Sequence, residues 1–260
     1  MAEQPVNILE TEALSRHYGG VIALSKVNLE VRSGQISSLI GPNGAGKTTL
    51  FNCVTGLDKP TIGKVRFSGR YITGLRPDEV TGLGIARTFQ NIRLFSELTV
   101  LDNVKIGRHP RTSSSFLGSV LRTARQKQEE KEIIDAAMEM LNFVGLGDIS
   151  EQKAGNLSYG DQRRVEIARA LATQPTLLLL DEPAAGMNPQ ETQELIDLIY
   201  TIREQGISVL LIEHDMKLVM KISDWVSVLD HGEKISTGIP ADVQNDERVI
   251  AAYLGTSDDA

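Results

Sequence analysis

Short, uninterrupted apolar runs in the second half of the chain predict strands that are covered on both faces. Residues 177–180 read LLLL and residues 209–212 read VLLI, a pattern typical of buried parallel strands. Between them, apolar residues recur at helical spacing over 195–202. This helix is expected to begin at Asn188 and Pro189, an N-cap residue followed by proline at the first helical position. The order strand, helix, strand predicts a βαβ crossover.

The first fifty residues combine an alternating pattern with a glycine-rich stretch. Val27, Leu29 and Val31 alternate with polar residues, which predicts a half-buried antiparallel strand. Residues 35–40 run directly into GPNGAGKTTL at 41–50. The expected order there is strand, loop, helix.

The middle of the chain, residues 91–157, is predicted to be a helical insertion. Thr99 and Asp102 have the spacing of a capping box that opens a helix. A second helix carries an apolar stripe. The stripe consists of Ile133, Ile134, Ala137, Met138 and Leu141.

Within this insertion, residues 105–127 contain several basic side chains and no Asp or Glu. One interpretation is a solvated basic face, and the other is contact with anionic lipid headgroups or a membrane-embedded partner. Both remain open. The basic residues are Lys105, Arg108, Arg111, Arg122, Arg125 and Lys127.

Composition narrows the class of protein. The 260 residues are enough for one large α/β domain, and the formal net charge of -7 argues against broad binding of nucleic acid. The single cysteine, Cys53, allows neither an internal disulfide nor a Cys-based zinc site. The first ten residues lack the features of a secretory signal, and no apolar stretch approaches the ~18 residues of a membrane span.

The glycine-rich stretch matches the phosphate-binding pattern G-x-x-x-x-G-K-[ST] after a strand and at a helix start. Backbone N–H groups there can cradle polyphosphate, Lys47 can reach the β- and γ-phosphates, and Thr48 can ligate Mg²⁺. A nucleoside polyphosphate and Mg²⁺ are therefore the expected ligands. The candidate loop residues are Gly41, Pro42, Asn43, Gly44, Ala45, Gly46, Lys47, Thr48 and Thr49.

An acidic pair, Asp181 and Glu182, follows the buried run LLLL. Ligands of open α/β sheets bind at the carboxyl ends of strands. Adjacent side chains at a strand end point in different directions, so we expect Asp181 to face Mg²⁺ and Glu182 to face an attacking water. His214 follows the run VLLI in the same way, where it can touch a γ-phosphate.

A third element, LSYGDQRRVEIARAL, begins at Leu157. Ser158 and Asp161 have capping-box spacing for the helix that follows. Ser158 and the backbone at Gly160 can also form a second polyphosphate site, because a helix N-terminus favours anions. Two such sites with one lysine-bearing loop suit a nucleotide held between two subunits.

With these motifs in this order, the sequence resembles the nucleotide-binding subunits of ATP-binding cassette transporters, in which a signature motif like LSYGDQ lies between two Walker-type motifs. The resemblance implies one P-loop NTPase domain of α/β class over 1–260. It implies a core with a parallel sheet and an N-terminal antiparallel β-subdomain over 1–90 and 158–240, a helical subdomain over 91–157, and a C-terminal tail over 241–260.

The resemblance also implies roles for single residues. Tyr18 in RHYGG matches the aromatic that stacks on adenine, Gln90 in RTFQN matches the glutamine between Mg²⁺ and the membrane subunit, and His214 in IEHDM matches the switch histidine. Asn188 stands where many cassettes have Asp. The implied nucleotide contacts include Ser158, Gly160 and Gln162, the implied metal ligands are Thr48, Gln90 and Asp181, and the implied catalytic residues are Lys47, Glu182 and His214.

Three segments, at 87–95, 181–189 and 213–240, look most like the cassettes that power bacterial import of branched-chain or other hydrophobic amino acids. Such subunits pair with a second, similar ATPase and two transmembrane permease subunits, fed by a periplasmic binding protein, at the cytoplasmic face of the inner membrane. Nucleic acid is not an expected partner.

Other functions share these motifs. A cassette of lipopolysaccharide export or urea import would look much the same from the ATPase alone. A DNA-repair cassette would need a coiled-coil insertion, a zinc module or a basic surface. A GTPase would need a guanine-reading N-K-x-D element, which the sequence lacks.

Overall fold

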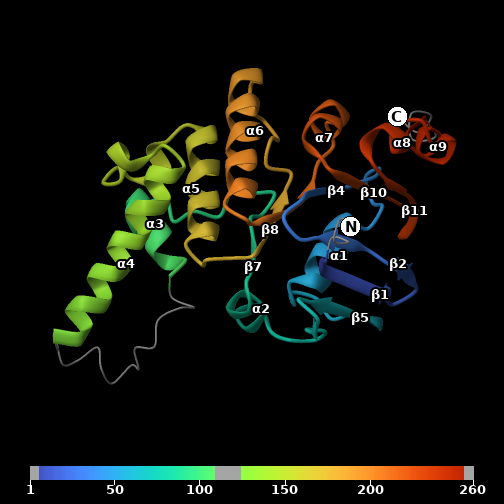
Figure 1. Ribbon diagram of the computed structural model, residues 1–260, viewed down its shortest axis with the longest axis horizontal. Helices are drawn as coiled ribbons and strands as arrows, with labels where there is room; N and C mark the ends of the chain where they lie inside the picture. The colour runs from blue at the N-terminus through green and yellow to red at the C-terminus, as the bar shows by residue number, and fades with distance from the viewer. Residues whose placement is uncertain (1–5, 109–123, 255–260) are drawn as a thin grey trace, which may run out of the picture.

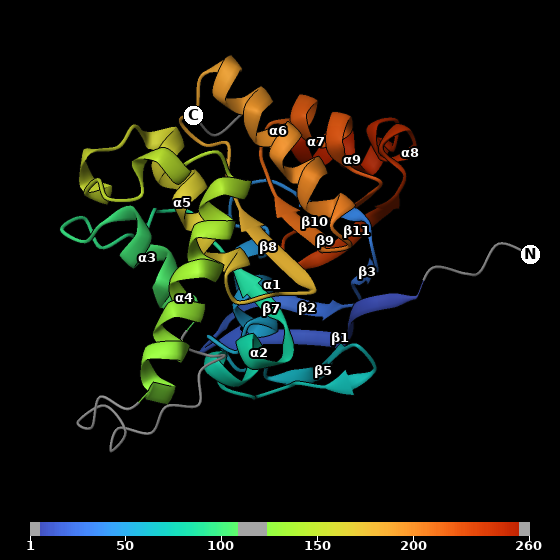
Figure 2. The same cartoon turned by 60° about the vertical axis from the view of Figure 1, so that its left-hand side comes forward.

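A computed structural model describes residues 6–108 and 124–254 (Figure 1). Most of the basic run predicted over 105–127 lies outside these residues. Two sheets lie against each other, and helices α3, α4 and α5 gather at the side away from the C-terminal helices in both views (Figure 2). In the two described stretches, no helix has the length and apolar character needed to cross a bilayer.

The larger sheet has six strands in the order β11-β10-β4-β9-β8-β7. All neighbours pair in parallel except β11, which runs antiparallel to β10 at one edge. The predicted βαβ crossover is confirmed, because helix α6 (Pro189–Glu204) connects β8 to its neighbour β9. The strands are β4 (Ile36–Ile40), β7 (Ile85–Arg87), β8 (Leu177–Asp181), β9 (Ser208–Ile212), β10 (Trp225–Asp230) and β11 (Glu233–Gly238).

Both faces of this sheet are buried, as the uninterrupted apolar runs predict. Leu178 and Leu180 of β8 face a core shared with α5 (Tyr159–Leu171) and α6. Leu177 and Leu179 face a second core, shared with α1 (Lys47–Val54) and the antiparallel sheet. Alternate side chains of one strand therefore serve different cores, which fixes its register.

The smaller sheet is antiparallel and centres on β1. The single strand expected through Val27, Leu29 and Val31 is wrong, because β2 ends at Val27 and β3 begins at Glu30. Thr11 occupies the break: its hydroxyl donates to Val27 O (2.9 Å) and accepts from Leu29 N (2.8 Å). The three apolar residues are nevertheless buried, since both strands pair with β1. The strands are β1 (Asn7–Tyr18), β2 (Val21–Val27), β3 (Glu30–Arg32), β5 (Ile62–Phe67) and β6 (Arg70–Tyr71).

The helical insertion packs on the larger sheet through α5. Ala137 and Leu141 of the predicted stripe are buried in the same core as Val165 and Ala168 of α5. Because α5 serves both the insertion and the sheet, the proposed boundary at 157 stays a prediction. The described helices between α1 and α5 are α2 (Pro77–Leu83), α3 (Val100–Ile106) and α4 (Ala124–Phe143), with short 3-10 turns at Gly147–Ile149 and Ala154–Asn156.

The predicted helix caps form, but neither the Thr99–Asp102 nor the Ser158–Asp161 spacing closes a capping box. Thr99 Oγ1 accepts from Asp102 N (3.0 Å), but the Asp102 carboxylate binds Lys105 Nζ (3.0 Å) and does not close a capping box. At α6 the box is complete, because the Asn188 side chain accepts from the Glu191 amide and the Glu191 carboxylate accepts from the Asn188 amide. Polar side chains thus fix where these helices begin.

The three helices nearest the C-terminus pack beside β10 and β11. They cover a small apolar cluster that includes Ile40 of β4 and Val226 and Val228 of β10. These helices are α7 (Met216–Ile222), α8 (Pro240–Gln244) and α9 (Glu247–Leu254).

Candidate functional site

The glycine-rich loop connects β4 to α1 in a conformation that only glycine fits. Gly41 has φ +148°, and a Cβ there would lie 2.0 Å from Leu229 O. Gly46 has φ +101°, and a Cβ there would lie 2.5 Å from Ala23 O. The loop therefore packs tightly and presents the N-terminus of α1, the end of a helix that favours anions.

Lys47 is the first residue of α1, and its side chain folds back over the loop. Its Nζ donates to Gly41 O (2.7 Å) and Pro42 O (2.9 Å), and the residue is only 6% exposed. Burial lowers the pKa of Lys47, and the charges of Glu182 and Asp181 oppose that shift. A desolvated ammonium beside the loop is suited to polyphosphate.

A cavity of about 280 Å³ opens in front of this loop. Chain segments that are distant in the sequence meet there: the loop itself, the turn after β8, the turn after β9 and the segment after β7. The structure thus brings most of the predicted loop together with Gln90, Glu182 and His214. The lining residues are Ala23, Asn43, Gly44, Ala45, Gly46, Lys47, Thr48, Thr49, Gln90, Glu182 and His214.

Glu182 is held from both sides in this cavity. Its Oε1 lies 2.6 Å from His214 Nε2, and its Oε2 accepts from Gln90 Nε2 (2.8 Å). The backbone of Glu182 has φ +49°, and its amide donates to Ile212 O (2.9 Å). A non-glycine residue in the left-handed region stores strain, and such residues cluster at functional sites. The turn directs the carboxylate into the cavity.

Asp181 lies beside the cavity and is 2% exposed. Its Oδ2 forms a 2.7 Å ion pair with Arg87, whereas its Oδ1 is buried and has no hydrogen-bond partner. A buried, unpartnered carboxylate oxygen and the hydroxyl of Thr48, which lines the cavity, are hard oxygen ligands, as Mg²⁺ prefers. The residues present therefore fit a magnesium ion.

Two supporting residues escaped prediction from the sequence. Arg87 bridges the Asp181 carboxylate and Asn52 Oδ1 (2.7 Å), which ties β7, β8 and α1 together. Glu213 is 4% exposed and accepts from Ala184 N (2.8 Å) and His214 N (3.2 Å); burial raises the pKa of this carboxyl. The available signal for Glu213 was its position, a carboxylate directly after a buried strand.

Several predicted residues do not line the cavity. Gly41 and Pro42 are not among its lining residues, and their carbonyl oxygens accept hydrogen bonds from Lys47 Nζ. Tyr18 is half-exposed, its hydroxyl donates to Asp58, and the Arg16 guanidinium lies 4.3 Å from its ring centroid. Contact of Tyr18 with adenine therefore stays a prediction.

The predicted second phosphate site lies at the start of α5, also outside the cavity lining. Ser158 Oγ accepts from Asp161 N (3.1 Å) and donates to Asp161 Oδ2 (2.8 Å). Gln162 Nε2 donates to Leu157 O (3.0 Å), and a Cβ at Gly160 would lie 3.1 Å from a Glu191 carboxylate oxygen. The structure does not bring this motif to the chain's own phosphate loop.

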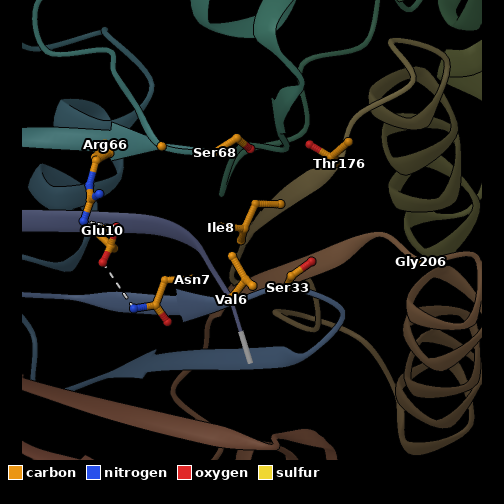
Figure 3. Close-up of a pocket in the computed structure, with 10 residues that line it drawn as sticks. Val6, Asn7, Ile8, Glu10, Ser33, Arg66, Ser68, Thr176 and Gly206 are labelled. Atoms are coloured by element: carbon orange, nitrogen blue, oxygen red, sulfur yellow. Dashed lines mark hydrogen bonds and ion pairs between the residues drawn. The ribbon is translucent and has the colours of Figure 1, made fainter. Parts of the chain in front are cut away.

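A larger cavity of about 720 Å³ lies where β1 begins (Figure 3). Glu10 accepts from Asn7 Nδ2 (3.2 Å) and pairs with Arg66 (2.6 Å) at its wall. None of the predicted site residues lines it.

The fold and the site together define a P-loop cassette that hydrolyses nucleotides. The features that define it are the glycine-rich loop at a helix start, the acidic pair at a strand end, the signature motif at the start of α5 and the strand order of the larger sheet. Residues 24–185 match the family model described as ABC transporter, and residues 233–259 match one described as branched-chain amino acid ATP-binding cassette transporter. The chain belongs to the ATP-binding cassette transporter family and is one of its ATPases. The family and the fold expected from the sequence are thereby confirmed.

Similar proteins narrow the group. The chain is 45% identical to the high-affinity branched-chain amino acid transport ATP-binding protein LivG of Salmonella typhimurium, over 95% of this chain and 98% of that protein. It is 46% identical to BraF of Pseudomonas aeruginosa, which has the same description and the same coverage. A nucleotide-free ATP-binding cassette from an ABC transporter has a TM-score of 0.85 and 35% identity, over 95% of this chain and 99% of that chain.

Proposed function

We propose that this chain hydrolyses ATP to power the import of branched-chain, or more broadly hydrophobic, amino acids. The observation that carries the chemistry is the Glu182 carboxylate, held between His214 and Gln90 in front of the lysine-bearing loop. The match of residues 233–259 to the branched-chain amino acid model supports the solute class. It favours amino acids over the urea and lipopolysaccharide alternatives.

The chain's own residues divide the work of hydrolysis. Lys47 neutralises phosphate charge and the loop amides hold phosphate oxygens. Glu182 orients a water molecule and accepts its proton, while His214 and Gln90 hold the carboxylate in position. Mg²⁺, held by Thr48 and Asp181 with Gln90 beside them, would supply charge neutralisation on the β- and γ-phosphates.

A second ATPase subunit is part of the proposal. Ser158 and Gly160 carry a second phosphate-binding helix start, yet they lie outside the cavity of their own chain. Each chain has two helix starts suited to phosphate but one lysine-bearing loop. Both helix starts contact nucleotide if the start of α5 in each subunit completes the ATP site at the lysine-bearing loop of its partner.

A membrane partner is expected near Phe95. Of the apolar residues following Gln90, Ile92 and Leu94 are partly buried, and Leu94 packs on the main core, but Phe95 is 55% exposed. Leu98 nearby is also exposed. An apolar surface this close to the site suits two transmembrane permease subunits, with the ATPase peripheral to the cytoplasmic face of a bacterial inner membrane and a periplasmic binding protein delivering solute.

The test is uptake by vesicles that contain this chain, its partner ATPase, two permease subunits and the binding protein. We expect ATP-dependent accumulation of labelled leucine and none of labelled urea. Phe95→Ser should lower uptake while the isolated subunit keeps its ATP hydrolysis. Vesicles that hydrolyse ATP but accumulate no hydrophobic amino acid would refute the solute class.

A further inference from the structure

The segment that carries Gln90 is fastened to helix α5 by a buried arginine. Arg163 is 0% exposed. Its Nη1 donates to Phe89 O (2.6 Å) and its Nη2 donates to Gln90 O (2.8 Å). A planar guanidinium is suited to holding two carbonyl groups at once.

A carboxylate and a second arginine complete the attachment. Glu166, 1% exposed, pairs with Arg163 Nη1 through Oε2 (2.7 Å), and its Oε1 accepts from Arg93 N (3.4 Å). Arg169 lies 3.6 Å from Glu166 Oε1 and donates to Arg93 O (2.6 Å). Burial raises the pKa of Glu166, and the charges of Arg163 and Arg169 oppose that shift. Side chains of α5 thus bind backbone groups at both ends of segment 89–93.

The residue immediately before this segment belongs to the sheet instead. Thr88 N donates to Leu179 O of β8 (3.0 Å), and Thr88 Oγ1 accepts from Asp181 N (3.4 Å). The partners of the backbone therefore change between Thr88, which is bonded to β8, and Phe89, which is bonded to α5. The Gln90 side chain reaches back across this junction to Glu182 (2.8 Å).

We infer that Arg163 and Glu166 are positioning residues for ATP hydrolysis, which fix the backbone of Gln90 to α5. This inference rests on the proposed ATPase function. The position of Gln90 relative to Glu182 is then set by α5, the helix that Ser158 caps. A buried ion pair is weak evidence for stability by itself, whereas four bonds to backbone groups of one functional segment specify where that segment lies.

The test is a double variant, Arg163→Met with Glu166→Met, which removes both charges of the buried pair, while Arg169 keeps its hydrogen bond to Arg93 O. With Mg-ATP and the purified chain, we expect kcat to fall at least about tenfold, with the ATP KM and the binding of a fluorescent ATP analogue changed less than about twofold. Arg203→Met on α6 is the control, because Arg203 forms a partly exposed pair with Asp224 (3.7 Å), and both residues lie outside α5 and outside segment 89–93. That variant should match the wild type.

Dependence on Gln90 separates positioning from general stability. In a Gln90→Ala background, the double variant should cause no further loss of kcat, because its effect acts through that glutamine. Independent, multiplicative losses would overturn the inference, as would an unchanged kcat. A wild-type chain that fails to hydrolyse ATP would instead contradict the proposed function.

Hydrogen exchange of the wild-type chain tests the attachment without any variant. The Arg93 amide should exchange at the rate of the α5 amides, because both belong to one unit. If the Arg93 amide exchanges at the rate of the β7 amides while the α5 amides exchange much more slowly, the inference is overturned. This result would count even if the double variant does not fold.

Discussion

The buried ion pair between Arg87 and Asp181 gives the sharpest stability prediction. Their side chains are 6% and 3% exposed, and the charged atoms lie 2.7 Å apart. Arg87→Met leaves the Asp181 carboxylate buried without its counter-charge. Removing one partner of such a pair costs about 3–5 kcal/mol. We therefore expect the free energy of unfolding to fall by about that amount.

The assay is equilibrium unfolding in urea, followed by the fluorescence of Trp225, the only tryptophan, which lies in β10 of the same sheet. Arg76→Met is the matched control, because Arg76 lies equally close to Asp78 (2.7 Å) but the two side chains are 72% and 66% exposed. It should unfold like the wild type. Adding Asp181→Leu to Arg87→Met should recover most of the loss. A loss below about 1 kcal/mol in Arg87→Met would show that the buried pair contributes no more than an exposed one.

Three further predictions concern Glu213, Lys47 and Ser158. Burial raises the pKa of Glu213 in the folded chain, so the stability its protonated form provides is present at low pH and is lost as the pH rises through that raised pKa. The unfolding free energy of Glu213→Gln minus that of the wild type should therefore increase as the pH rises from 4 to 7. A difference that does not change with pH would contradict this prediction. Lys47→Ala should weaken binding of a fluorescent ATP analogue, and unchanged affinity would show that the ammonium does not contact phosphate. In a mixed dimer with Lys47→Ala on one subunit, adding Ser158→Arg to that same subunit should abolish turnover at the intact lysine loop, whereas an unchanged rate would exclude a shared site.

Local patterns predicted the local parts of the site. The phosphate loop, the strand ends at Asp181 and His214, and the Asn188 cap each depend on residues that are close in the sequence. Gln90 entered through family resemblance, and the structure gives it a partner in Glu182.

The sequence could not predict contacts between distant segments. Arg87 and Asp181 are 94 residues apart, and Arg163 and the Phe89 carbonyl are 74 apart, so neither pair leaves a periodic signal. The strand through Val27 was mispredicted for a related reason: the break depends on the hydroxyl of Thr11 in another strand. The alternation of apolar and polar residues predicts which side chains are buried. It does not predict where a side chain of a neighbouring strand takes the place of a backbone hydrogen bond between strands.

The substitution Glu182→Gln measures whether Glu182 activates the attacking water. Glutamine keeps the shape of the side chain and can still bond to His214 and Gln90, but it cannot accept the proton. Steady-state hydrolysis of Mg-ATP should fall at least about 100-fold, while a fluorescent ATP analogue binds as tightly as to the wild type. Hydrolysis at the wild-type rate in Glu182→Gln would show that Glu182 is not the base that activates the water.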